Sequence, residues 1–141
     1  MDELLTKIEG MFADGMHCSQ IMLQLACEMR DKENPDLIRA MGGLGGGLFK
    51  RDKICGSLLG GCAIMGLYGA KSGPEDEIKF DYKKAVMELT DWYEGEFGSI
   101  ICNEIVEDDR MKVLNTCPAI TCKAFIRCME MLDELGIDTS E

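Results

Sequence analysis

The 141-residue sequence predicts an all-α protein, a compact bundle of five to seven helices around a glycine-rich central helix. Apolar residues recur at the three- and four-residue spacing of a helix face in most segments. No segment shows a confident strand pattern. Glycine and proline divide the chain into short helical segments, and no long linker separates them. The length suits one domain spanning residues 1–141.

Three helices are expected in the first 41 residues. The first ends before Gly15, and its apolar stripe consists of Leu4, Leu5, Ile8, Met11 and Phe12. The second begins near His17 and ends at Met29. The third opens at Asn34-Pro35 and reaches Met41, because proline is tolerated in the first turn of a helix.

A glycine-rich loop and a glycine-rich helix are expected next. Five glycines fall among residues 42–47, and their backbone entropy opposes a helix there. The following helix is expected from Cys55 to about Ala70. Residues 54–70 carry no charge, but these 17 residues lie at the short limit for a membrane span and include five glycines. We therefore expect a buried central helix, closely approached by its neighbours, and no membrane insertion.

The remaining chain is expected to hold three more helices. The fifth helix runs over residues 75–97, with its apolar side chains on one face. Ser99 is the candidate cap of a short helix through residues 102–106, and the charged residues 107–110 then form a solvated turn. The last helix is expected to begin near Pro118.

The charge balance limits the partners of the protein. Asp and Glu total 26 and Lys and Arg total 15, which gives a net charge of −11. This charge repels a phosphate backbone, so no nucleic-acid binding is expected, and an anionic membrane surface is disfavoured for the same reason. The acidic start, Met1-Asp2-Glu3, lacks the basic region and apolar run of a signal peptide. We therefore expect a cytoplasmic protein.

Cysteine is the residue type that points to chemistry, because the chain has eight cysteines and one histidine. In a reducing compartment such a set is more typical of metal binding or redox activity than of structural disulfides. Four cysteines lie near predicted helix starts, where the positive end of the helix dipole stabilises a thiolate: Cys18, Cys55, Cys117 and Cys122. The cations Lys50, Arg51 and Lys53 precede Cys55 and add to this effect. Cys18 and Cys55 are therefore predicted to be low-pKa thiolates.

The spacing of the cysteines requires a site assembled from distant segments. Cys55 and Cys62 lie two helical turns apart, about 10 Å along the axis, which is too far for a disulfide. No Cys-x-x-Cys occurs, which weakens both a thioredoxin-type motif and a zinc knuckle. No Cys-x-x-Cys-His occurs either, so covalent haem is not expected.

Several motifs together indicate a family. They are Phe12-x-x-Gly15-x-x-Cys18-Ser19-Gln20, the glycine loop 42–47, Cys55-Gly56-Ser57-Leu58-Leu59-Gly60, Gly61-Cys62-Ala63-Ile64-Met65-Gly66, and Phe97-Gly98-Ser99-Ile100-Ile101-Cys102 with the late cysteines. Over nearly the whole chain they resemble the C_GCAxxG_C_C family of probable redox proteins. The chain departs from the family pattern at Ser57, where the family usually has alanine.

The resemblance implies a redox function and four shared cysteines. By motif, these correspond to Cys18, Cys55, Cys102 and one late cysteine. Cys122 is preferred for the last position, because Phe125 and Ile126 follow it at helix-face spacing, and Cys117 is the rival. Secondary candidates are Cys62, Cys117 and His17, the last as a base or a ligand. Cys27 and Cys128 have no motif around them and are expected to be structural.

Three functions stay open at this point. The first is a redox protein that works as a thiol-based oxidoreductase. In it a low-pKa cysteine attacks a disulfide, and a cysteine from another helix resolves the mixed disulfide that forms. The second is a metal or iron–sulfur site held by the thiolates of Cys18, Cys55, Cys102 and Cys122. The third is a non-catalytic helical interaction protein with buried cysteines. The sequence specifies neither the cofactor and redox partner nor whether the chain forms a homo-oligomer.

Overall fold

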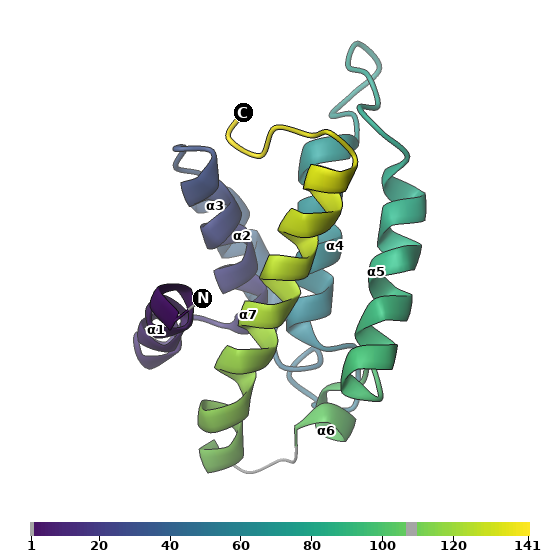
Figure 1. Cartoon of the computed structure of the whole chain (residues 1–141). Helices are drawn as coiled ribbons and strands as arrows, with labels where there is room; N and C mark the ends of the chain where they lie inside the picture. The colour runs from purple at the N-terminus through teal and green to yellow at the C-terminus, as the bar shows by residue number, and fades with distance from the viewer. Residues whose placement is uncertain (1, 107–109) are drawn as a thin grey trace.

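The computed structural model describes residues 2–106 and 110–141, and within them it contains seven α-helices and no strand. The helices are α1 (Asp2–Ala13), α2 (Cys18–Met29), α3 (Pro35–Met41), α4 (Gly56–Gly69), α5 (Tyr82–Phe97), α6 (Cys102–Ile105) and α7 (Arg110–Glu134), with a short 3-10 helix, η1, at Gly42–Leu44. The predicted all-α class is confirmed. Figure 1 shows the helices packed side by side as a bundle.

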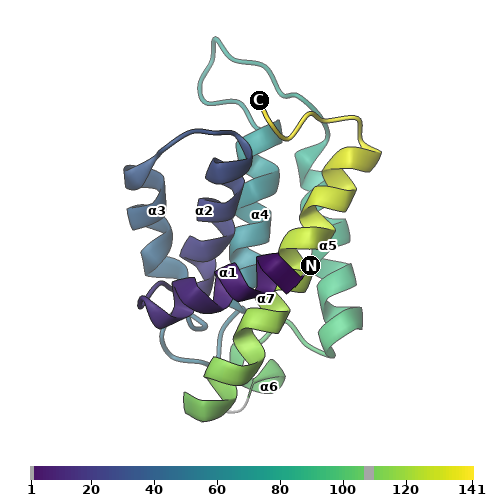
Figure 2. The same ribbon diagram turned by 60° about the vertical axis from the view of Figure 1, so that its left-hand side comes forward.

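The glycine-rich helix α4 lies at the centre of this bundle, as predicted. It packs against α2, α5 and α7, while α3 flanks the outer side of α2 and α1 crosses α7 (Figure 2). Glycine permits this close packing. A β-carbon at Gly60 would lie 2.6 Å from Cβ of Met22 on α2, and one at Gly61 would lie 2.8 Å from a methyl carbon of Leu89 on α5. Among the described residues, no helix is long and apolar enough to cross a membrane.

Two helices begin at places other than those predicted. Helix α5 begins at Tyr82 instead of Glu75, because Asp81 caps it by accepting a hydrogen bond from the Lys84 amide, 3.1 Å away. Helix α7 begins at Arg110, and Pro118 lies inside it. Residues 107–109 of the expected solvated turn lie outside the described residues. Its last residue, Arg110, is the first residue of α7.

Pro118 does not end the helix because it removes only one hydrogen-bond donor, whereas burial holds the segments on both sides of it. Val113 and Cys117 precede the proline and pack against the core, and Ile120 follows it and is 6 % exposed. A proline inside a helix costs about 3 kcal/mol, a penalty that the burial of several apolar side chains offsets.

The segment between η1 and α4 is a loop, as predicted, but an unusual one. Gly46, Gly47, Leu48, Phe49 and Arg51 all have φ between 54° and 69°. Two hydrogen bonds close this left-handed turn, from the Phe49 amide to the Gly45 carbonyl (3.0 Å) and from the Arg51 amide to the Gly46 carbonyl (3.1 Å). Each non-glycine residue held in this region costs about 1–2 kcal/mol, so the loop stores backbone strain.

Replacing Leu48 by glycine is expected to raise the free energy of unfolding by about 0.5 kcal/mol. The change relieves the left-handed strain at φ 56°, and the greater entropy of glycine in the unfolded chain cancels part of that gain. Leu114 is the matched control, because it is 43 % exposed against 45 % for Leu48 but lies in helix α7. Leu114→Gly is expected to lower the free energy of unfolding by about 1 kcal/mol. Urea unfolding measures both, and equal losses in the two variants would contradict the strain at Leu48.

Candidate functional site

Four cysteines line one small cavity, and one of them, Cys102, begins α6, the short helix at the lower end of the bundle in Figure 1. The cavity has a volume of about 130 Å³. Its cysteines are Cys18, Cys55, Cys102 and Cys117, and apolar side chains form much of the remaining wall: Phe12, Met16, Val106, Val113 and Ile120. The structure thus brings together residues that are up to 99 positions apart in the sequence (117 minus 18).

Helix starts position three of these cysteines. Cys18 is the first residue of α2, Cys55 is the N-cap of α4 and Cys102 is the first residue of α6. An isolated antiparallel bridge between Ile54 and Ile101 aligns the last two. In it the Cys55 amide donates to the Ile100 carbonyl (2.8 Å), and the Cys102 amide donates to the Lys53 carbonyl (2.9 Å). Cys117 reaches the cavity from the N-terminal half of α7.

The glycine loop lies directly behind these cysteines. A β-carbon at Gly47 would lie 2.8 Å from Cβ of Cys102, and one at Gly56 would overlap the Sγ atom of Cys18. One at Gly45 would lie 2.9 Å from Cβ of His17. Only glycine therefore fits at these positions, which explains why the motifs around the cysteines contain so many glycines.

The low-pKa thiolate predicted for Cys18 is wrong. Burial raises the pKa of the Cys18 thiol to about 11, and the nearby charge of Cys55 raises it further. Hydrogen bonds from the backbone of Gly46 and Ser19 lower the pKa, as expected at a helix start, but burial outweighs them. Cys18 is consequently a neutral thiol at pH 7.

Cys117 also carries a raised pKa. The pKa of its thiol is about 12. Burial is the largest cause of this rise, and the charges of Cys18, Cys55 and Cys102 add to it, whereas the charge of Arg51 lowers the pKa. The predicted helix start at this residue is absent, because Cys117 lies inside α7. The other cavity sulfurs thus lie close enough to Cys18 and Cys117 to raise the pKa of these two thiols beyond the effect of burial.

Tyr93 is a site residue that the sequence analysis missed. Its side chain is fully buried, and its hydroxyl lies 3.0 Å from Sγ of Cys55. Burial, together with the charge of Cys55, raises the pKa of Tyr93 far above its usual range, so the hydroxyl stays protonated. The sequence showed Tyr93 only as part of an apolar helix face. The available signal was that a buried tyrosine hydroxyl requires a hydrogen-bond partner.

Cys122, the preferred fourth cysteine, does not line the cavity. It is 1 % exposed in the core, and Cys117 is at the cavity instead. The reason is geometric. Both residues belong to the same helix, and five residues correspond to a rotation of about 140°, so the two side chains point in different directions.

The other candidates are distributed around the molecule. His17 lines the cavity, is exposed, and its ring lies 5.0 Å from that of Phe49. Cys62 is half-buried on α4 and hydrogen-bonds with Thr90 of α5, away from the cavity. Cys27 and Cys128 are buried in the core outside the cavity.

All eight cysteines are free thiols in the structure. Among the described residues, no group of three or more His, Cys, Asp or Glu side chains is arranged to hold a metal ion.

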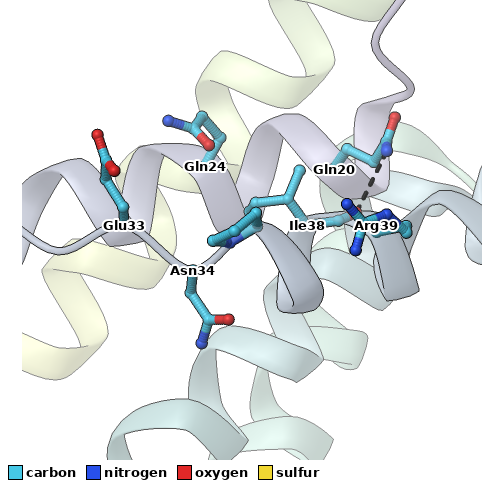
Figure 3. A pocket seen from close by; sticks show the side chains of 7 residues that line it. Gln20, Gln24, Glu33, Asn34, Ile38 and Arg39 are labelled. Atoms are coloured by element: carbon cyan, nitrogen blue, oxygen red, sulfur yellow. Dashed lines mark hydrogen bonds between the residues drawn. The ribbon is translucent and has the colours of Figure 1, made fainter.

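A larger hollow of about 500 Å³ lies between α2 and α3 (Figure 3). Its polar side chains already hold these helices together. Gln20 Nε2 donates to the Ile38 carbonyl (3.2 Å), and Asn34 caps α3 by accepting from the Leu37 amide (3.1 Å). No cysteine lines it, so the small four-cysteine cavity is the candidate site.

Comparison with known proteins agrees with the resemblance seen in the motifs. A family model described as "putative redox-active protein (C_GCAxxG_C_C)" matches residues 16–134. No curated protein and no solved structure matches the chain. Because the family model spans most of the sequence and includes all four cavity cysteines, the chain belongs to the C_GCAxxG_C_C family of redox-active proteins.

Proposed function

We propose that this protein carries out thiol–disulfide redox chemistry in the four-cysteine cavity. The observation that carries the proposal is the convergence of Cys18, Cys55, Cys102 and Cys117 from four helices on one cavity of about 130 Å³. Cysteines that serve only as small apolar filler have no reason to share a cavity with each other. The volume equals roughly four water molecules, so only a slender group such as the end of a small disulfide enters.

Cys18 and Cys55 are the expected exchanging pair. After burial, the charge of Cys55 has the largest effect on the pKa of Cys18, and the Cys18 sulfur rests against Gly56, the residue that follows Cys55. In the net reaction, two protein thiols and one external disulfide give one protein disulfide and two external thiols. We propose that the exposed His17 imidazole, which lines the cavity, accepts a proton from a thiol.

The proposal implies a compartment and a partner. Thiols that are free at rest fit a reducing cytoplasm. Each turnover leaves the protein oxidised, so a thiol reductant has to regenerate it. We propose that this reductant acts at the same cavity.

A metal or iron–sulfur cluster is the second candidate function. It is favoured by the number of thiols, because an exchange reaction needs two and the cavity has four. It is also favoured by Cys117, whose pKa is raised first by burial and then by the charges of the other three sulfurs, since a bound cation reverses such repulsion. The absence of a metal-binding group among the described residues opposes it.

Metal analysis and thiol titration of one anaerobic sample test the proposal. We expect no stoichiometric metal and a fall in titratable thiols from eight to six after oxidation with oxidised glutathione. Peptide mass spectrometry is expected to place the disulfide between Cys18 and Cys55. Cys62→Ser is the matched control, because Cys62 is half-buried like Cys18 but lies off the cavity, and this variant should still lose two thiols.

The other outcomes of this experiment contradict the proposal. Stoichiometric iron with visible absorption indicates the cluster, and a zinc content of one per chain indicates a thiolate metal site. Metal-free protein that keeps all its thiols after oxidation indicates structural cysteines. A disulfide formed only between cysteines outside the cavity also contradicts the assignment.

A further inference from the structure

A row of buried hydroxyl groups ends on the sulfur of Cys55. Ser57 of α4 and Thr121 of α7 are hydrogen-bonded to each other, with their hydroxyl oxygens 2.8 Å apart. Tyr93 of α5 is hydrogen-bonded to Cys55, with its hydroxyl 3.0 Å from Sγ. Ser57, Thr121 and Tyr93 are each at most 2 % exposed. These polar groups come from three helices, and Ser57 also lines the cavity.

A side-chain hydrogen bond between Ser57 and Tyr93 joins the two pairs into one row, and Tyr93 is the member of the row that contacts the sulfur. A thiolate carries no proton, so it can only accept a hydrogen bond. Whenever the Cys55 sulfur is ionised, the Tyr93 hydroxyl is therefore its donor, and the Ser57 hydroxyl remains as a partner for the tyrosine oxygen.

Packing alone does not explain these hydroxyl groups. Phenylalanine, alanine and valine would fill nearly the same volumes without any polar group to satisfy in the core. A buried hydroxyl row whose final acceptor is a sulfur supplies what a negatively charged sulfur requires, a fixed donor in a dry site.

We propose that Tyr93, supported by Ser57 and Thr121, is a positioning residue that donates a hydrogen bond to the Cys55 sulfur and makes Cys55 the attacking thiol of the cavity. This role rests on the thiol–disulfide function proposed above. The Cys55 thiolate attacks one sulfur of the incoming disulfide, and the first external thiolate leaves. Cys18 then loses its proton and attacks the Cys55 sulfur, which releases the second external thiolate. The two protons lost by the cysteines end on the two external thiols, and Tyr93 keeps its own proton throughout.

Alkylation of the reduced full-length protein by iodoacetamide, followed cysteine by cysteine with peptide mass spectrometry, tests this role. In the wild type, Cys55 is expected to react fastest of the four cavity cysteines at pH 7. In Tyr93→Phe its rate is expected to fall about tenfold, the effect of losing one hydrogen bond to a charged group. The curve of rate against pH is also expected to move to higher pH, whereas the rates of Cys18 and Cys117 stay within about twofold.

Tyr68→Phe is the matched control. Tyr68 is 8 % exposed, and its hydroxyl donates one hydrogen bond, to the Thr139 carbonyl (2.7 Å), at the other end of α4. This variant makes the same chemical change in a comparable environment, and the alkylation rate of Cys55 is expected to stay unchanged. An equal slowing of Cys55 in the two variants overturns the proposal, and so does a wild type in which Cys55 is not the fastest.

Ser57→Ala provides a second variant that is expected to fold, because alanine fills nearly the same volume as serine and suits a helix. It removes the hydrogen-bond partner behind Tyr93 but leaves the Tyr93 hydroxyl in place, so Cys55 is expected to slow by about threefold. If Tyr93→Phe does not fold, as judged by its melting transition, this variant decides, and an unchanged Cys55 rate overturns the proposal. Alkylation is measured on the reduced protein, so its result is independent of whether oxidation forms a disulfide. Failure of the proposed function appears instead in the thiol count.

Discussion

Replacing Gly56 by alanine is expected to lower the free energy of unfolding by about 3 kcal/mol and to prevent Cys18 from pairing with Cys55. The new β-carbon would overlap Sγ of Cys18 and would lie 3.2 Å from the Leu44 carbonyl oxygen and 3.3 Å from Cα of Gly45. Two of these neighbours are backbone atoms, which cannot rotate away as the end of a long side chain can. Overpacking of this kind typically costs about 1–3 kcal/mol, and here relief requires moving the cavity wall.

Gly66→Ala is the control for this prediction. Gly66 lies in the same helix, and a β-carbon there would meet nothing within 4 Å. Alanine at this position is expected to raise the free energy of unfolding by about 0.5–1 kcal/mol, because it reduces the backbone entropy of the unfolded chain. Urea unfolding under reducing conditions measures both variants, and the thiol count after oxidation measures the pairing. A Gly56→Ala protein with wild-type stability and a normal loss of two thiols would show that Cys18 is not seated against this residue.

The elements that could be predicted from the sequence are those that depend on local pattern. Helices α1 to α4 follow from apolar spacing and from the breakers between them, and their observed bounds lie close to the expected ones. The central place of α4 also follows, because five glycines in an uncharged segment suit a helix that its neighbours approach closely. These features depend on residues that are near each other in the chain.

The elements that could not be predicted depend on contacts between distant residues. A proline normally indicates a helix start, but burial of Val113 and Ile120 on its two sides keeps α7 continuous through Pro118. The choice between two cysteines depended on the tertiary structure as well. Cys122 is preferred in the sequence because Phe125 and Ile126 follow it at helix-face spacing, but in the folded chain Cys122 is buried in the core, and Cys117 is the residue that lines the cavity.

The chemistry of the site shows the same division. Cys18, Cys55 and Cys102 were selected by motif and by helix position, and the structure places all three on one cavity. The pKa values of their thiols could not be predicted from the sequence, because they depend on burial, and burial depends on how the whole bundle packs. A helix start favours a thiolate in water, but at Cys18 burial outweighs it. Tyr93 was missed for the same reason, since its contact with Cys55 joins residues 38 positions apart.

The stability of the reduced protein is expected to fall steeply as the pH rises above about 9. The folded protein raises the pKa of Cys18 to about 11 and the pKa values of Cys117 and Cys128 to about 12, from 9.0 for an unperturbed thiol. Above pH 9 the unfolded chain loses these protons while the folded chain keeps them. The unfolded state then binds fewer protons, so the free energy of unfolding decreases with pH. The three protonated thiols thus contribute their full stabilisation below pH 9, and this stabilisation is lost progressively as the pH rises to 11–12.

Each of the three thiols is expected to contribute a slope of about 1.4 kcal/mol per pH unit within this window. Between pH 8 and pH 10 they together remove about 4 kcal/mol, a large part of the stability of a domain of this size. Urea unfolding with a non-thiol reductant at several pH values measures the slope. Cys117→Ala is expected to lower the stability at pH 8 through the lost burial of its side chain. It is also expected to reduce the slope above pH 9 by about 1.4 kcal/mol per unit.

Val113→Ala separates the loss of a proton from the loss of packing. Val113 lines the same cavity from the same helix and carries no titratable group, so its truncation should displace the whole stability curve without changing its slope. Equal slopes in Cys117→Ala and the wild type would mean that the Cys117 thiolate is tolerated in the fold.

A disulfide has no proton to lose. Oxidation that joins Cys18 to Cys55 is therefore expected to reduce the slope of stability against pH above pH 9. Cys128→Ala is expected to reduce this slope further in both the reduced and the oxidised protein, because Cys128 lies in the core outside the cavity.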